Sequence, residues 1–191
     1  MNVIDEQDEL FRMILAIQNS NEEIFSSFYD RVVSRVYALA NRILVNRADA
    51  EEVVCDVFTQ IWQQAKSYQP EKGNVIAWCM VITRSRALDN LRKKKKHSDR
   101  IQDAADFYQE VADEQCEPDK VIQMFQENSG IRIVLESLSG VQRQFVALSF
   151  FRGLTHQEIS DATSIPLGTV KSNIRRALER LQSHSLLLEK I

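Results

Sequence analysis

The sequence predicts an all-α fold, and three observations lead to this prediction. Only five glycines and three prolines occur among the 191 residues, and 44% of the residues are apolar, which is enough to fill protein cores. Apolar side chains recur every three or four positions, as they do along the buried side of a helix. The valine-rich alternating runs typical of strands are missing. We therefore expect two small helical domains, over residues 8–97 and 129–184, joined by an acidic flexible linker over residues 98–128.

Helical periodicity and breaker residues divide the first domain into four helices. The expected helices cover residues 10–20, 22–44, 46–68 and 75–96. Pro70 and Gly73 interrupt the third helix, and Asn74 can cap the fourth. The predicted buried side of the fourth helix consists of Ile76, Ala77, Met80, Val81, Ala87, Leu88 and Leu91.

Charge is unevenly distributed along the chain. The net charge is −3, which by itself does not indicate a nucleic-acid-binding protein. However, residues 84–96 and 171–180 are each strongly basic, and the acidic stretch 103–119 separates them. Because local fields matter more than the sum, two separate basic surfaces for nucleic acid remain compatible with this composition.

The sequence argues against several other classes of protein. The cysteines Cys55, Cys79 and Cys116 form no CxxC pair, and the three histidines are dispersed, so we expect no metal, no other cofactor and no disulfide framework. A sensing role for Cys116 is a separate hypothesis. We expect no membrane insertion, because no apolar run approaches about 20 residues. The acidic N-terminus does not resemble a signal peptide, which predicts a cytoplasmic protein. No constellation of catalytic residues suggests an enzyme.

Residues 154–181 predict a helix-turn-helix. Thr155 and Glu158 have the spacing of a capping box, and Pro166 restarts the chain for a second helix. One face of that helix carries Val170, Ile174, Ala177, Leu178 and Leu181, and the opposite face carries Thr169, Ser172 and Arg176, flanked by Lys171 and Arg175. Such a helix fits the DNA major groove. An ordinary helical hairpin with a solvated basic face is the alternative. A second capping box, Ser139 with Gln142, begins the helix before it, and Gly153 can end that helix.

Four segments of this chain together resemble one family. They are DAEEVVCDVFTQIW, GNVIAWCMVITRSRALDNLRKKKK, LSGVQRQFVALSFFRGLTHQEIS and IPLGTVKSNIRRALERL. In this order and spacing they resemble the extracytoplasmic-function (ECF) sigma factors of the bacterial sigma-70 family, over about residues 10–182. The resemblance implies a dissociable RNA polymerase subunit that selects and opens promoters. It further implies sigma region 2, a linker and sigma region 4.

The resemblance assigns the helix 49–62 to region 2.2, which binds a coiled coil of the polymerase β′ subunit. The implied core-polymerase contacts are Asp49, Glu51, Glu52, Asp56 and Gln60. These side chains lie mainly off the apolar stripe of the helix, and the alternative is a merely solvated acidic face. The implied partners are core polymerase, through its β′ and β subunits, promoter DNA and an anti-sigma factor.

Residues 68–96 match regions 2.3 and 2.4, which recognise and melt the −10 element. Aromatic and amide side chains can hold unstacked bases, while Arg and Lys hold phosphates. The implied contacts are Lys72, Asn74, Trp78, Arg84, Arg86, Asn90, Arg92 and Lys93. Trp78 has core packing as its alternative. For most of the run 93–96 the alternative is nonspecific attraction to phosphate.

The second helix of the helix-turn-helix matches region 4.2, which reads the −35 element. The implied contacts are Leu167, Thr169, Lys171, Ser172, Arg175 and Arg176. Ser164 departs from the glycine of many relatives and adopts turn geometry less easily. The implied function is an alternative sigma factor in a stress, envelope or environmental response. A standalone helix-turn-helix regulator would leave residues 49–96 unexplained, and an adaptor or anti-sigma-like protein is a further alternative.

Overall fold

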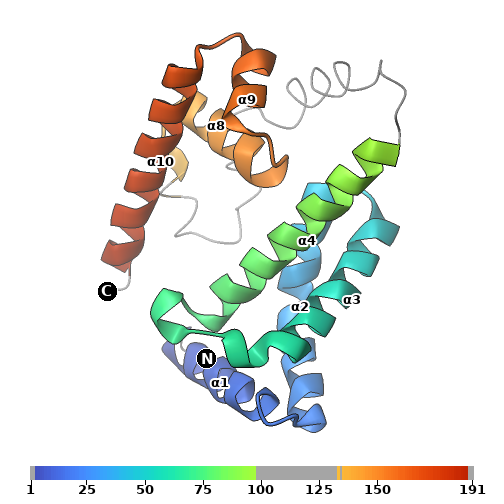
Figure 1. Ribbon diagram of the computed structural model, residues 1–191. Coiled ribbons are helices and arrows are strands. Elements are labelled where there is room, and N and C mark those ends of the chain that lie inside the picture. The colour runs from blue at the N-terminus through green and yellow to red at the C-terminus, as the bar shows by residue number, and fades with distance from the viewer. Residues whose placement is uncertain (1–2, 98–132, 134, 189–191) are drawn as a thin grey trace. The chain divides into compact units, whose positions relative to one another are not determined.

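A computed structural model describes residues 3–97, 133 and 135–188, with side chains for 6–94, 133 and 135–183. Every regular element in these ranges is a helix, as Figure 1 shows, which confirms the predicted all-α class. The chain divides into two compact units, residues 1–99 and 100–191. The expected linker 98–128 and Cys116 lie outside the described residues.

The first unit consists of four α-helices and two short 3₁₀ helices. These are α1 (Val3–Ile17), α2 (Glu22–Leu44), α3 (Arg47–Gln64), η1 (Ala65–Ser67), η2 (Pro70–Lys72) and α4 (Val75–His97). The bounds of α2 agree with the prediction, whereas α1 begins seven residues earlier than expected. The loop predicted around Pro70 contains η2, with Pro70 in its first turn, where a missing N–H costs no hydrogen bond.

Asparagine side chains cap three of these helices. The Oδ1 atoms of Asn21, Asn46 and Asn74 accept backbone N–H groups three residues later, at 3.0, 3.1 and 2.8 Å. Each cap satisfies a donor that the first helical turn leaves without a partner. The predicted cap at Asn74 is therefore confirmed, and it sets where α4 begins.

The core of the first unit lies where α2 packs against both α3 and α4. Its fully or almost fully buried side chains include Phe28, Val32, Val36, Ile43, Val53, Val57 and Ile61. Leu10 and Ile14 add the inner face of α1 to this core. Because apolar burial is the main stabilising term in folding, this packing fixes the relative positions of α3 and α4.

The predicted buried side of α4 is partly wrong. Val81 is 68% exposed and Ala77 is also exposed, whereas Val75 and Cys79 are buried. Thr83, which the prediction left out, is buried too, and its hydroxyl donates to the Cys79 carbonyl at 2.7 Å. Ala87 and Leu88 are buried, and Ile76, Met80 and Leu91 are half-buried. The first half of α4 is apolar on nearly every side, so its period alone does not define the inner face.

The second unit has helical backbone at 133 and 135–137, followed by α8 (Gly140–Phe151), α9 (His156–Thr163) and α10 (Leu167–Leu188). Both predicted capping boxes are present. They join Ser139 to Gln142 and Thr155 to Glu158. Gly153 follows α8 with φ of 64°, a left-handed conformation that glycine adopts without a Cβ clash.

The inner face of α10 is narrower than predicted. Val170, Ile174 and Ala177 are buried and Leu181 is half-buried, but Leu178 is 55% exposed. At about 100° per residue, Leu178 lies about 80° around the helix from Val170. It is therefore at the margin of the stripe that faces α8 and α9, and its predicted burial is wrong.

Val45, the C-cap of α2, leads to a prediction about stability. Its backbone is left-handed, with φ of 55° and ψ of 13°, and its side chain is 59% exposed. This conformation costs a β-branched residue about 1–2 kcal/mol. We expect Val45→Gly to raise the free energy of unfolding of the first unit by about 1 kcal/mol, measured by urea denaturation of the full chain with tryptophan fluorescence.

Val81→Gly provides the matched control, because it removes another exposed valine, in this case from a helix interior. It should lower the free energy of unfolding by about 0.5 kcal/mol. Both tryptophans, Trp62 and Trp78, lie in the first unit and report on it. A shift of the same sign in both variants would contradict the assignment of strain to Val45.

Candidate functional site

The predicted polymerase-binding residues on α3 differ in what they contact. Glu52 and Asp56 are exposed and form no ion pair with the described residues. Glu51 pairs with Arg47 at 2.8 Å on the surface. The Asp49 carboxylate is only 14% exposed and pairs with Lys94 of α4. Glu52 and Asp56 are thus the carboxylates most available to a basic partner.

Gln60, the fifth predicted residue, is engaged inside the unit. Its Oε1 accepts the Nε–H of Arg86 at 2.6 Å, and its Nε2 donates to Oε1 of Gln64 at 2.9 Å. The sequence assigned Gln60 and Arg86 to two different surfaces. The structure joins them by a hydrogen bond between α3 and α4.

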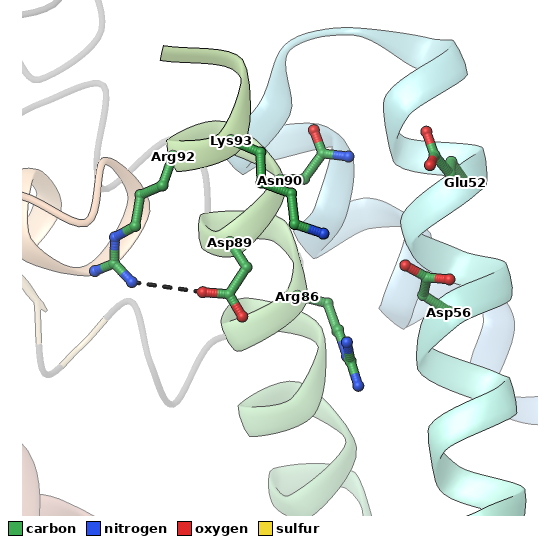
Figure 2. A pocket seen from close by; sticks show the side chains of 7 residues that line it. All are labelled: Glu52, Asp56, Arg86, Asp89, Asn90, Arg92 and Lys93. Carbon is green, nitrogen blue, oxygen red and sulfur yellow. Dashed lines mark ion pairs between the residues drawn. The ribbon is translucent and has the colours of Figure 1, made fainter. Parts of the chain in front are cut away.

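A cleft of about 340 Å³ lies between α3 and α4, and Figure 2 shows it from close by. Its lining residues are Glu52, Asp56, Arg86, Asp89, Asn90, Arg92 and Lys93. Glu52 and Asp56 extend from α3 toward α4, whereas Arg92 extends to the other side of α4 and pairs with Asp89 at 3.5 Å. The predicted polymerase surface and part of the predicted −10 surface therefore adjoin along one cleft.

Seven of the eight predicted −10 contacts form two groups along α4 or directly before it, and Arg84 lies between these groups. Arg86, Asn90, Arg92 and Lys93 lie in its second half, beside the cleft. Lys72, Asn74 and Trp78 lie at its beginning. At about 1.5 Å per residue, Trp78 and Asn90 are about 18 Å apart along the helix axis. Together the two groups span a length that can follow several nucleotides.

The group at the beginning of α4 has well-defined surroundings. The Trp78 ring is half-buried against Tyr68, with centroids 5.4 Å apart. The Tyr68 hydroxyl donates to the Gly73 carbonyl at 3.0 Å, which ties down the segment before the helix. Burial is the main cause that raises the pKa of Tyr68, and the nearby Cys79 and Glu71 raise it further by smaller amounts. The hydroxyl therefore keeps its proton and remains a donor. Asn74 is exposed but already caps α4 through its Oδ1.

Arg84 lies between the two groups and is less exposed than a typical surface arginine. Burial lowers the pKa of Arg84 below its ordinary value, and repulsion from Arg92 lowers it further. An arginine nevertheless stays charged at neutral pH. Arg84 and Arg92 thus concentrate positive charge on α4.

The turn between α9 and α10 depends on Ser164. This residue is left-handed, with φ of 55° and ψ of 23°, the conformation for which glycine is favoured. The Ser160 hydroxyl donates to the Ile165 carbonyl at 2.7 Å across the turn. Pro166 then accepts the backbone N–H groups of Thr169 and Val170, at 2.8 and 3.1 Å, at the start of α10. Serine therefore maintains the glycine-like turn despite the departure from the family pattern.

The predicted −35 contacts lie on the outer side of α10. Thr169, Lys171, Arg175 and Arg176 are exposed, and Leu167 and Ser172 are half-buried. The Ser172 hydroxyl donates to the Thr169 carbonyl at 3.0 Å, and Arg175 pairs with Glu179 at 3.5 Å. All six residues fall within about three turns, a length that suits a helix lying in the major groove.

Sequence reasoning missed several residues around the site. Gln64 orients Gln60, Asp89 pairs with Arg92, and Lys94 pairs with Asp49. Of these three contacts, only those between Gln60 and Gln64, four residues apart, and between Asp89 and Arg92, three residues apart, have a helical spacing that can be recognised in the sequence. Among the described residues, no cluster of His, Cys, Asp or Glu could hold a metal ion, and no helix is long and apolar enough to cross a membrane.

Comparisons with known proteins agree with this architecture. The family described as Sigma-70 region 2 matches residues 28–97, and Sigma-70, region 4 matches residues 134–183. The two matches cover more than half of the chain. The fold and the two matches define a two-domain protein of the sigma-70 type.

Curated relatives narrow the assignment. An ECF RNA polymerase sigma factor RpoE of Cereibacter sphaeroides is 32% identical over 94% of this chain and 96% of its own length. An ECF RNA polymerase sigma factor SigK of Mycolicibacterium vanbaalenii is 28% identical over 91% of this chain and 88% of its own. A solved sigma factor RpoE from Bartonella quintana, crystallised with the anti-sigma factor NepR, is 23% identical, with a TM-score of 0.37, over 84% of this chain and 95% of its own. This chain belongs to the ECF sigma factors of the sigma-70 family, which are transcription initiation factors and not enzymes in themselves.

The two described cysteines should differ sharply in reactivity. Cys55 is exposed on α3, whereas burial raises the pKa of the Cys79 thiol to about 12. In a Cys116→Ser variant at pH 8, iodoacetamide should alkylate Cys55 and leave Cys79 unmodified until urea is added, as measured by mass spectrometry.

The raised pKa of Cys79 also makes the free energy of unfolding depend on pH. The Cys79 thiol ionises near 9.0 when unfolded and near 12 when folded, so the unfolded state loses its proton first. The contribution of Cys79 to stability is complete below about pH 9 and is lost as the pH rises toward 12. Equal alkylation rates for Cys55 and Cys79 in the native protein would contradict the burial of Cys79.

Proposed function

We propose that this chain is an alternative sigma factor in which α3 binds core RNA polymerase, α4 binds the −10 element and α10 reads the −35 element. The family supports the overall role, because ECF sigma factors direct promoter-specific initiation. The observation that carries the residue-level assignment is the cleft between α3 and α4, where exposed carboxylates and α4 cations lie on one packed unit.

Glu52 and Asp56 form the centre of the proposed polymerase contact. Both extend from α3, and neither is neutralised by an ion pair with the described residues. Basic side chains on a coiled coil of the β′ subunit would form ion pairs with these two carboxylates. Complementary charges would also speed the encounter of the two proteins. Asp49 and Glu51 contribute less, because each already has a cationic partner.

The α4 helix supports recognition and opening of the −10 element. Cations in its second half can hold phosphates, and Trp78 and Asn74 at its beginning offer an aromatic face and an amide to unstacked bases. Stacking on an aromatic side chain contributes about 1–3 kcal/mol per base. With Trp78 half-buried and already packed on Tyr68, this stacking surface is limited, which favours a strict choice of promoter.

The α10 helix supports reading of duplex DNA at the −35 element. Its outer side presents Arg176 and Lys171, both exposed, and the α9–α10 turn holds it in a helix-turn-helix. A standalone helix-turn-helix regulator would need only this part. The match of residues 28–97 to Sigma-70 region 2 therefore favours the sigma factor over that alternative.

Family membership supports two further proposals. A cognate anti-sigma factor would bind the protein and release it on a stress or envelope signal. Because the polymerase and the chromosome are the proposed partners, the cytoplasm is the proposed location. The linker 98–128 would connect the two DNA-binding units.

Charge reversal tests the polymerase contact. We expect Glu52→Lys and Asp56→Lys each to weaken binding to core polymerase about tenfold, because each puts a cation where a carboxylate meets a basic surface. Binding is measured by fluorescence anisotropy of the labelled full chain. Asp30→Lys is the matched control, since Asp30 is also exposed but lies on α2.

Core polymerase should also slow alkylation of Cys55, which lies on α3 between Glu52 and Asp56 in sequence. Circular dichroism and thermal unfolding check that the variants fold. Full affinity in both charge-reversal variants, with Cys55 as reactive as in the free protein, would rule out this docking face.

Alanine substitution separates base reading from phosphate binding on α10. We expect Arg176→Ala to lose about 1–3 kcal/mol of discrimination at a specific −35 base pair, because a bidentate Arg–guanine contact supplies that much. Holoenzyme binding to a series of base-substituted promoters measures it. Arg175→Ala, which removes a residue already paired with Glu179, should have a smaller effect. Uniform weakening on every sequence would show that Arg176 contacts phosphate.

A further inference from the structure

The Gln60 amide is held at both of its polar atoms. Its Nε2 donates to Gln64 one turn later on α3, and its Oε1 accepts from Arg86 on α4. Since Arg86 can only donate, the Gln60 atom that faces α4 must be the amide oxygen, and the amide nitrogen then lies toward Gln64. The side chain that makes the 2.6 Å bond to Arg86 is thus held at its other polar atom as well.

Arg86 is held by a neutral group although carboxylates lie in the same cleft. Asp56, one turn before Gln60 on α3, lines the cleft together with Arg86. A carboxylate partner balances a cation, as Asp49 does for Lys94, whereas an amide leaves the guanidinium with its full charge. The bond uses only Nε–H, so with respect to the described residues the terminal N–H groups of Arg86 remain available for other acceptors.

We propose that Gln60 is a positioning residue for Arg86 in promoter recognition, and not a contact to core polymerase. It fixes the guanidinium on the cleft side of α4 without neutralising it, so that Arg86 meets a phosphate or a base edge of −10 DNA in one geometry. The proposal rests on the proposed function, in which α4 binds the −10 element.

The principal test is Gln60→Ala in the full chain, with Gln63→Ala as its matched control. Gln63 is an exposed glutamine on the same helix. We expect Gln60→Ala to leave the dissociation constant for core polymerase within about twofold. The preference of the holoenzyme for its best −10 sequence over single-base substitutions should fall about threefold to tenfold, the loss expected for one typical hydrogen bond. Gln63→Ala should change neither quantity.

Gln60→Glu separates position from charge. Glutamate can still accept the Nε–H of Arg86, but it adds a negative charge beside the guanidinium. We expect this variant to keep more of the −10 preference than Gln60→Ala. Its DNA binding should be less salt-dependent, by about one unit in the slope of log K against log salt concentration.

Two outcomes would overturn the proposal. One is weaker binding of Gln60→Ala to core polymerase with an unchanged −10 preference, which would make Gln60 a polymerase contact. The other is a −10 preference for Gln60→Ala equal to that of Gln63→Ala, while Arg86→Ala lowers the preference. If Arg86→Ala itself has no effect, the proposed role of this part of α4 in −10 binding fails. In support of the proposal, adding Gln60→Ala to an Arg86→Ala variant should cause no further loss of the −10 preference.

Discussion

The packing of α4 against α2 and α3 is the constraint on which the candidate site depends. Val75, Cys79 and Thr83 are buried on the inner side of α4, and this choice of face determines what the rest of the helix presents. With these residues inside, Arg86 and Asn90 line the cleft beside α3, while Val81 faces solvent. A rotation of α4 about its axis would bury Val81 and separate Arg86 from Gln60. One apolar interface therefore holds the proposed polymerase and DNA surfaces in register.

Charge is distributed unequally across this interface, and the difference has a chemical consequence. Lys94 is paired with a carboxylate of α3, whereas Arg86 is held by an amide and Glu52 has no cationic partner among the described residues. The first pair is internally balanced and acts mainly between the helices. The other two groups retain their charges for outside partners. Neighbouring side chains on the same two helices can thus serve the fold and the proposed binding functions separately.

Local signals could be read from the sequence, whereas contacts between distant residues could not. The asparagine cap at Asn74 and the capping box at Thr155 follow from residues within one turn of each other, and the bounds of α2 follow from the helical periodicity of its apolar residues. The structure confirms all three. The face of α4 was predicted only in part, because its first half is apolar on most sides. The Arg86–Gln60 bond joins residues 26 positions apart and depends on how two helices pack. The periodicity of α3 and of α4 therefore does not predict that these two side chains meet.

Transcription by purified core RNA polymerase tests the central claim most directly, namely that the first unit couples polymerase binding to promoter opening while α10 supplies duplex recognition. The measurement is transcript mapping on a genomic promoter library, with and without this protein. The account predicts discrete transcripts that require the protein and share −35 and −10 elements. Sequence-specific duplex binding by the protein alone, with no transcripts from the polymerase, would contradict it and favour a standalone regulator.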